Sequence, residues 1–293
     1  MVITYTATNT KRLKDLKRKR LRIFWYKVLF VFIGLLVLFG ASVLIMRIDK
    51  LKITKVTIEG NHVVQSEDIQ KKINEELSGN YLFFFPKRNG LLYPRHTIRN
   101  DLQEAFPRFD QVVVTRENIN EIKIAVVERE SVYLWCGMHV RNFTDTDNPC
   151  YYVDEQGYIF SKAPYFSGTI YFKFFGSNIA LSDDNPIGQY VLPSNLWGQV
   201  VLLKDDIESL GFAPHSLAVY DKGEYSFLLS SVPEDTRLRI VFSDKYDLKK
   251  IGANLASALS VEPLKTDIQT KFISLEYIDL RYENKVYYKF TKE

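Results

Sequence analysis

The sequence has 293 residues, of which 46% are hydrophobic and 14% aromatic, so it can bury a substantial core and is not disordered as a whole. Its net charge of +4 averages two opposite regions. Residues 1–27 hold nine Lys or Arg and one Asp, a net charge of +8, which leaves 30 basic and 34 acidic residues, a net charge of −4, for the rest. The pattern is a basic tail on a mildly acidic body, which excludes a uniformly basic protein.

An uncharged stretch of nineteen residues, Val28–Met46, follows the basic tail. As a helix it would be about 28 Å long, enough to cross the hydrocarbon core of a bilayer. Trp25 and Tyr26 precede it, where amphipathic rings favour the headgroup level, and Lys27 can extend back to the surface. Because the positive residues come before the span, the N-terminus is predicted to lie in the cytoplasm.

Two other interpretations of the N-terminal region are less favoured. A cleaved secretory signal could use the small residues Ala41 and Ser42, but the apolar run is longer than a typical signal and lacks an A-x-A site, so a retained anchor is expected. The basic run Lys17–Arg20 could bind nucleic acid. No nucleic-acid recognition fold surrounds it, so a topology signal that also touches anionic headgroups is favoured.

The next eighty residues predict a small sheet with two helices on one face. In order they are a strand at Ile53–Glu59, a helix with Ser66 as N-cap that closes at Gly79, an aromatic loop at Tyr81–Asn89, a helix at Arg95–Phe106, and strands at Gln111–Arg116 and Ile122–Val127.

A family resemblance rests on four pieces of this segment: KVTIEGN at 55–61, SEDIQKKI at 66–73, IRNDLQEAFPRFDQVVVTR at 98–116 and EIKIAVVER at 121–129. Together they resemble a POTRA domain, a βααββ module. The closing Glu128-Arg129 is typical of the version found in FtsQ/DivIB cell-division proteins. Family members often have Pro after that pair and in the preceding hairpin, where this chain has Glu130-Ser131 and Asn118-Ile119-Asn120. These departures concern loop geometry.

The remaining chain is similar to the same family. YYVDEQGYIF at 151–160 resembles its strand–turn–strand signature, with Asp154 and Gly157 shaping the turn. YIDLRYENKVYYKF at 277–290 predicts a hairpin, and YIDLRY resembles the family's C-terminal strand pair. Between them we expect a helix near Pro193–Leu210, strands at Ser216–Tyr220, Tyr225–Leu229 and Leu238–Phe242, and a helix carrying Leu248, Ile251, Leu255 and Leu259, capped by Ser243 or Asp244.

The predicted fold class is therefore α+β, with one N-terminal transmembrane helix, a POTRA-like βααββ domain and a C-terminal mixed β domain with two helices. The predicted boundaries are a basic cytoplasmic tail at 1–27, the transmembrane helix at 28–46, the POTRA-like domain at 50–130 and the FtsQ/DivIB-like β domain at 131–293.

The two cysteines, Cys136 and Cys150, lie on the predicted extracytoplasmic side, flanking a loop-rich segment. A disulfide across this hairpin is slightly favoured in an exported domain. The alternatives are two unpaired buried thiols or a metal site, although His139 alone would leave a metal site incomplete.

No catalytic, cofactor-binding or metal-binding residues are predicted. The sequence lacks GxSxG, HExxH, Walker A and GxGxxG motifs, and its four histidines (His62, His96, His139 and His215) are expected on loops and turns. Asp183-Asp184 in a turn and Asp205-Asp206 on a helix are interpreted as solvated charge. Arg281 is as well suited to pair with Asp279 or Glu283 as to bind an anion.

The predicted partner-binding site is the edge of the C-terminal strand pair, where unpaired backbone groups can accept a partner strand. Val286, Tyr287, Tyr288 and Phe290 are unusually apolar for an exposed strand. Core packing explains alternate positions only, so a bound partner is expected to contact the others, with Tyr282 and Tyr288 supplying specificity. The predicted residues are Tyr277, Asp279, Arg281, Tyr282, Val286, Tyr287, Tyr288 and Phe290. Which strand edge is free is left open.

The resemblance implies a non-enzymatic divisome scaffold in the bacterial cytoplasmic membrane at the division septum. Its partners would be FtsB/FtsL-type proteins, it would help regulate septal peptidoglycan synthesis, and it would bind neither nucleic acid nor a small-molecule substrate. One rival is a POTRA protein of export or outer-membrane assembly, which would continue into many membrane β-strands, whereas this sequence ends at Glu293. The other is a membrane-anchored cell-wall enzyme, which would need converging titratable groups.

Overall fold

The computed structural model describes residues 6–139, 149–166, 170–177, 181, 185–220, 223–229 and 238–291, without the side chains of residues 6–15 and of residue 273. By their internal contacts, residues 1–104 with 111–127 form one compact unit, and residues 105–110 with 128–293 form another. Helix α1, Thr6–Met46, opens the first unit, and a 3-10 helix, Asp49–Leu51, follows it. Among the described residues, α1 contains one candidate membrane span by length and composition, Leu16–Met46, which supports the predicted anchor.

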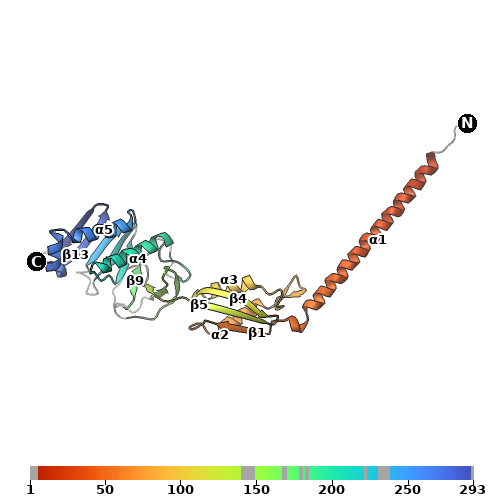
Figure 1. Cartoon of the computed structure of the whole chain (residues 1–293), viewed down its shortest axis with the longest axis horizontal. Coiled ribbons are helices and arrows are strands. Elements are labelled where there is room, and N and C mark those ends of the chain that lie inside the picture. The colour runs from red at the N-terminus through yellow and green to blue at the C-terminus, as the bar shows by residue number, and fades with distance from the viewer. Residues whose placement is uncertain are drawn as a thin grey trace. The chain divides into compact units, whose positions relative to one another are not determined.

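The first unit has the strand and helix order that the sequence predicts (Figure 1). Its elements are β1 Lys55–Glu59, α2 Ser66–Glu76, β2 Asn80–Tyr81, β3 Phe85–Pro86, α3 Arg95–Ala105, β4 Phe109–Asn118 and β5 Glu121–Glu128. The three-stranded sheet has the order β1-β5-β4, with β1 and β5 parallel, and β2 and β3 form a separate small hairpin. The aromatic loop of the sequence prediction is thus a hairpin at its start.

Amphipathic helices build the core of this unit. Ile69 and Ile73 of α2 and Ile98 and Leu102 of α3 are buried, because spacings of three to four residues place each pair on one face. The sheet contributes Val112, Val114, Ile122, Ile124 and Val126. The N-cap prediction for Ser66 was wrong by one position: Ser66 is already the first helical residue and Gln65 is the cap. The Ser66 hydroxyl instead accepts a hydrogen bond from Asn61 Nδ2 at 3.0 Å.

The second unit is built on a nine-stranded mixed sheet in the order β14-β13-β12-β11-β10-β9-β6-β7-β8. Strand β9 is parallel to both of its neighbours, and β12 is parallel to β13. The strands are β6 Tyr133–Trp135, β7 Tyr151–Val153, β8 Ile159–Lys162, β9 Phe172–Phe175, β10 Ser216–Tyr220, β11 Glu224–Leu228, β12 Arg239–Ser243, β13 Leu275–Tyr282 and β14 Lys285–Phe290.

Helices α4, Ser194–Ser209, and α5, Leu248–Leu259, pack together on this sheet (Figure 1). At Gly252 of α5 the two helices lie close together, since a Cβ there would lie 2.8 Å from Asp206 Oδ2 and 3.4 Å from Leu203 Cδ1 of α4. The predicted caps Ser243 and Asp244 were wrong, since the helix begins later, where Asp247 accepts the backbone N–H of Lys249. A third helix, α6 Leu264–Lys271, adds to the two that were predicted. The predicted α+β class is confirmed.

An arginine at the start of the second unit organises its first turn. Arg129 Nη1 lies 2.5 Å from Asp154 Oδ2 and 3.0 Å from Asp110 Oδ1, and its guanidinium lies over the ring of Tyr158. Asp154 also accepts the backbone N–H groups of Gln156 and Tyr158. The following Gly157 has a φ of +85° and packs against a Trp ring. The predicted role of Asp154 and Gly157 in this turn is confirmed.

Candidate partner-binding edge

The predicted site lies on the hairpin that ends the nine-stranded sheet. Strand β14 pairs with β13 on one side and has no second neighbour among the strands that the structure describes. In the register, Ile278 is opposite Tyr288 and Asp279 is opposite Tyr287. Both register shifts insert the extra residue into β13, so the alternation along β14 is uninterrupted. The open edge is therefore a regular strand.

The side chains of β14 divide between its two faces. Val286, Tyr288 and Phe290 pack against the hydrophobic core under α4 and α5, which explains their apolar character without a partner. Tyr287 points to the opposite face and is 48% exposed. Tyr288, the other residue predicted to supply specificity, is partly buried and lies on the face that packs against the core.

Tyr282 and Tyr287 form the exposed aromatic pair of the hairpin. Their ring centroids are 5.0 Å apart at an interplanar angle of 73°, an edge-to-face arrangement, and Tyr282 is 51% exposed. Edge-to-face pairs are favourable because the positive ring edge meets the negative ring face. The pair presents a fixed apolar surface beside the open edge.

The backbone direction of β14 follows from one hydrogen bond at its end. Thr291 N donates to Ser274 O at 2.7 Å, so the N–H of residue 291 points toward β13. Successive residues of a strand direct their N–H groups to opposite sides. We infer that the N–H groups of Val286, Tyr288 and Phe290 face the open edge, whereas that of Tyr287 faces β13.

A buried carboxylate and an arginine brace β13 behind this edge. Arg281 holds Asp279 through two contacts, Nε to Oδ1 at 3.0 Å and Nη2 to Oδ2 at 2.7 Å, and its Nη1 lies 3.1 Å from Glu224 Oε2. Burial alone would raise the pKa of Asp279, but the hydrogen bonds and charge of Arg281 outweigh it, and the pKa lies below its usual value. The hydrogen bonds of Asp279 also raise the pKa of Arg281.

This brace decides between the two interpretations of Arg281. All three guanidinium nitrogens already contact carboxylates, so the side chain is a structural ion pair and does not serve as an anion site. The predicted partner Asp279 is correct. Glu224, on strand β11 beyond β12, was not predicted, because its proximity to Arg281 depends on the order of strands in the sheet.

One further ion pair and one cation–π contact lie on the hairpin. Lys289 Nζ lies 2.6 Å from Glu276 Oε2, and this contact raises the pKa of Lys289. The guanidinium of Arg239 lies 6.0 Å from the ring centroid of Tyr277. The eight predicted residues thus lie on one hairpin: Asp279 is buried, three residues are partly buried against the core, and the other four are partly or largely exposed.

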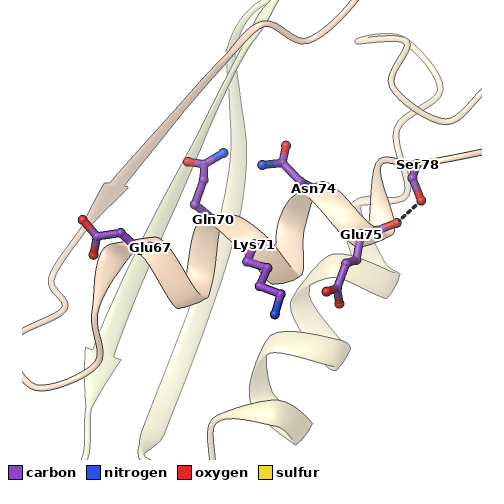
Figure 2. Close-up of a pocket in the computed structure, with 6 residues that line it drawn as sticks. All are labelled: Glu67, Gln70, Lys71, Asn74, Glu75 and Ser78. Atoms are coloured by element: carbon purple, nitrogen blue, oxygen red, sulfur yellow. Dashed lines mark hydrogen bonds between the residues drawn. The ribbon is translucent and has the colours of Figure 1, made fainter.

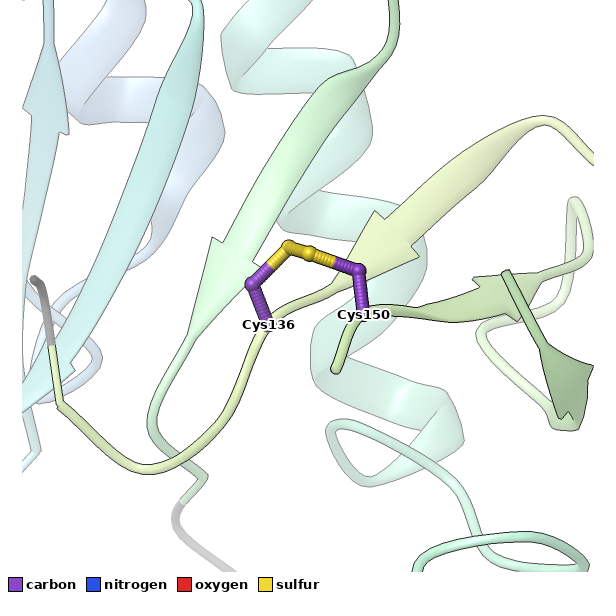
Figure 3. The surroundings of a disulfide bond; sticks show 2 residues. All are labelled: Cys136 and Cys150. Carbon is purple, nitrogen blue, oxygen red and sulfur yellow. A yellow bond between two sulfur atoms is a disulfide. The ribbon is translucent and has the colours of Figure 1, made fainter. Parts of the chain in front are cut away.

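The disulfide partners lie together at the opposite half of the sheet. Figure 3 shows Cys136, just after β6, joined to Cys150, just before β7, with an S–S distance of 2.05 Å and a Cα–Cα distance of 4.2 Å. The surrounding cluster contains Leu134, Ala163 and Phe175. The bond ties two antiparallel strands at the point where their pairing ends.

Groups that might support chemistry are dispersed. No three His, Cys, Asp or Glu side chains gather in the described part of the chain. The histidine prediction was wrong for His96, which lies in the first turn of α3. His215 lies in the loop just before β10, as predicted, but it is buried, with its backbone bonded to β9 and β11. Asp205 pairs with Lys204 on α4. Asp183-Asp184 lies outside the described residues.

A shallow hollow lies along α2 in the first unit (Figure 2). Gln70 and Asn74 point to one side of the helix and Lys71 and Glu75 to the other, and the Ser78 hydroxyl donates to the Glu75 carbonyl. The lining residues are Glu67, Gln70, Lys71, Asn74, Glu75 and Ser78. They all belong to one solvated helix and its end, so they do not converge on a common point.

Comparison with known families supports the resemblance seen in the sequence. Residues 51–129 match the model of the POTRA domain, FtsQ-type. A comparison with curated proteins gave no significant match.

Proposed function

From an FtsQ-type POTRA domain at residues 51–129 behind one candidate membrane span, we infer that the chain is a single-pass membrane protein of the FtsQ/DivIB family. From this premise we propose that it is a non-enzymatic scaffold of the bacterial divisome. In this proposal it binds FtsB/FtsL-type proteins and helps regulate septal peptidoglycan synthesis. The basic tail lies in the cytoplasm, and both folded units lie on the other side of the cytoplasmic membrane at the septum.

The open edge of β14 is the observation that carries the binding proposal. A partner strand placed beside β14 can pair with the N–H and C=O groups that face outward, and main-chain hydrogen bonds supply affinity in this mode. Tyr282 and Tyr287, exposed beside the edge, supply side-chain specificity. Large aromatic residues near a buried backbone contact are frequent hot spots.

Structural pairing of the charged groups supports a scaffold over an enzyme. The ion pairs formed by Arg281, Asp279 and Arg129 connect strands and a turn of the fold. A hydrolase or transferase would need a nucleophile, a base and a polarising group that converge on one cleft. The described residues bring no such set together.

Co-purification tests the proposed partners. The full chain, tagged at its N-terminus so that β14 stays unmodified, should be isolated in mild detergent from membranes of the bacterium that naturally produces it. We expect FtsB- and FtsL-type proteins in the complex, and less of them with the Y282A/Y287A chain. A Y220A chain provides the matched control, because Tyr220 is a similarly exposed tyrosine at the end of β10. Recovery of the chain without these proteins would contradict the partner assignment.

Cell imaging and a topology reporter test the remaining parts. A fluorescent protein fused before residue 1 should gather at the septum, and depletion of the protein should give filaments without septa. A reporter active only in the cytoplasm should be active when fused before Lys27 and inactive when fused after Glu293. The opposite reporter pattern would contradict the orientation.

A further inference from the structure

The hairpin β2–β3 of the POTRA domain exposes an unusual run of apolar side chains. Five successive residues, Tyr81–Phe85, are aromatic or aliphatic. Leu82 at the tip is 78% exposed and Phe83 is 89% exposed. Contiguous exposed apolar side chains commonly mark a protein or membrane contact. The run therefore needs an occupant that the folded unit does not supply.

The backbone at the tip is held in a conformation that such residues rarely adopt. Leu82 has a φ of 47° and Phe83 a φ of 66°, both in the left-handed region. Two bonds close the hairpin around them: Phe84 N donates to Tyr81 O and Lys87 N donates to Gly79 O, each at 3.1 Å. Strain of this kind persists where surrounding structure imposes it, and it is common at functional contacts.

The same hairpin contacts the end of α1. The ring of Phe39 meets that of Phe84 at 5.6 Å and that of Phe85 at 5.8 Å, measured between centroids. Arg47 Nε donates to Phe84 O at 3.4 Å. The fully buried Asn89 donates through Nδ2 to Met46 O at 2.8 Å. The hairpin is therefore fixed to the last two turns of the apolar segment.

The depth of this contact follows from helix geometry. Phe39 precedes Met46 by seven residues, which is about 10 Å along the helix axis. The apolar segment Val28–Met46 is just long enough to cross a hydrocarbon core of about 30 Å. When the segment spans the bilayer, Phe39 lies well inside the leaflet on the POTRA side. Side chains that reach the level of Phe39 from outside must enter that leaflet.

We propose that the tip Leu82–Phe84 inserts into the acyl-chain region of this leaflet as a second anchor beside α1. The POTRA domain is then held to the membrane at two points, the covalent span and the apolar tip. The inference rests on the membrane span and does not depend on the division role.

The flanking residues suit this position. Lys87, whose Nζ lies 5.9 Å from the centroid of the Tyr81 ring, follows the hairpin. Arg47 and Lys50 follow the span. Cations and Tyr at the edge of an apolar insertion favour the headgroup level, where they meet anionic lipid phosphates. A partner protein helix would not require this cationic rim, so lipid is the occupant that the arrangement favours.

Tryptophan fluorescence in lipid nanodiscs tests the insertion. The full chain with Trp25→Phe, whose remaining Trp135 and Trp197 are buried in the second unit, serves as background. Into it we place Phe83→Trp, and in a separate chain Val127→Trp as matched control. Val127 is an exposed residue of the same domain, at the end of β5 that lies away from α1. The other end of β5, at Glu121, pairs with Lys55 near α1 and lies about 20 Å from Val127 along the strand. Nanodiscs of phosphatidylcholine and phosphatidylglycerol carry one chain each, with bromine on the lipid acyl chains.

We expect the added emission of F83W to be blue-shifted and quenched at least threefold more by the brominated lipid than that of V127W. Aqueous iodide should quench V127W more than F83W. Equal iodide quenching of the two chains, without bromolipid quenching of F83W, would overturn the proposal. Protection of F83W from both quenchers would also overturn it, because it would indicate a protein contact. Leu82→Trp gives a second readout with the same expectation if F83W fails to fold.

Discussion

Tyr282 and Tyr287 meet edge to face across the last hairpin of the sheet, with ring centroids 5.0 Å apart. Tyr282 is the last residue of β13 and Tyr287 lies within β14, so the pair belongs to the turn end of the hairpin. Neither ring is in the core, and both lie beside the strand edge proposed to receive a partner. This position makes the pair a test of specificity that leaves the fold intact.

Removing either tyrosine should weaken partner binding more than it weakens the fold. For Tyr282→Ala and Tyr287→Ala we expect about tenfold lower partner affinity each, roughly 1.4 kcal/mol. Changes in the free energy of unfolding should stay within about 1 kcal/mol, because both side chains are half-exposed. The double variant should reveal a coupling of about 0.5–1.5 kcal/mol between the rings. Calorimetric titration with the partner's extracytoplasmic domain measures the affinities and their coupling, and urea unfolding measures the stability. Unchanged affinity in the double variant would exclude the pair from the interface.

Proline at two adjacent positions of β14 should separate binding from folding. Tyr287→Pro removes an N–H that we infer faces β13, so it should destabilise the hairpin. Tyr288→Pro removes an N–H that faces the open edge, so it should impair partner binding.

Tyr288→Pro also removes a ring that packs against the core, which could itself change binding. Tyr288→Ala is the control for this effect, because it loses the ring and keeps the N–H. We expect Y288P to bind at least tenfold more weakly than Y288A, with similar circular dichroism. Equal affinities of Y288P and Y288A would show that this N–H does not contact the partner.

The Asp279–Arg281 pair should make stability dependent on pH in a defined direction. The pKa of Asp279 is depressed in the fold, so its contribution is fully present above its unfolded pKa of about 3.9 and is lost as pH falls through the folded value. Arg281→Met removes the hydrogen bonds and charge that lower this pKa, and leaves burial, which raises it.

The R281M chain should therefore be less stable by about 1–3 kcal/mol at pH 7, a value reduced for the partial exposure of Arg281. The deficit relative to the parent should shrink as pH falls, first where the raised pKa of Asp279 in R281M lets this carboxyl be protonated, above about pH 4, and further where the parent's carboxyl is protonated, below about pH 4. Urea unfolding in detergent micelles, followed by fluorescence, measures both. Lys289→Met, which removes an exposed ion pair, should destabilise the chain less than R281M does. A deficit for R281M that stays constant from pH 7 to pH 3 would contradict the assignment.

The bond between Cys136 and Cys150 should form in the cell envelope and stabilise the second unit. The two residues are 14 positions apart, and closing a loop of this length in the unfolded chain contributes about 3 kcal/mol in the chain-entropy model. Reductant should lower the urea midpoint of the parent and leave a C136A/C150A chain unchanged. Recovery of both cysteines as alkylatable thiols, from envelopes never exposed to reductant, would contradict the prediction.

Local patterns predicted most of the elements, because each depends on neighbouring residues. The apolar spacing in α2, α3 and α5 and the turn at Asp154–Gly157 are visible in short windows of sequence. Strand β9 was not predicted, although Phe172–Phe175 is aromatic and ends before Gly176. The strand contains Lys173, and a lysine argues against a buried strand, but in the structure this lysine is almost fully buried within the sheet. Desolvation lowers the pKa of Lys173, a cost that sequence rules count against such a position.

The site was predicted as a hairpin, but its faces could not be assigned. Alternation in β14 divides Val286, Tyr288 and Phe290 from Tyr287, yet period alone does not say which set faces the core. Which set faces the core depends on α5, which precedes β14 in the chain and packs against it. The Arg281–Glu224 contact likewise depends on strand order, because the two residues are 57 positions apart.

Hydrogen exchange at single amides of β14 is the most direct test of the proposed partner edge. In the free chain the amides of Lys285, Tyr287 and Lys289, which we infer to face β13, should already exchange slowly. Those of Val286, Tyr288 and Phe290 should exchange quickly, and the extracytoplasmic domain of an FtsB-type partner should slow them at least tenfold. Partner binding that leaves these three amides fast would contradict strand addition at β14.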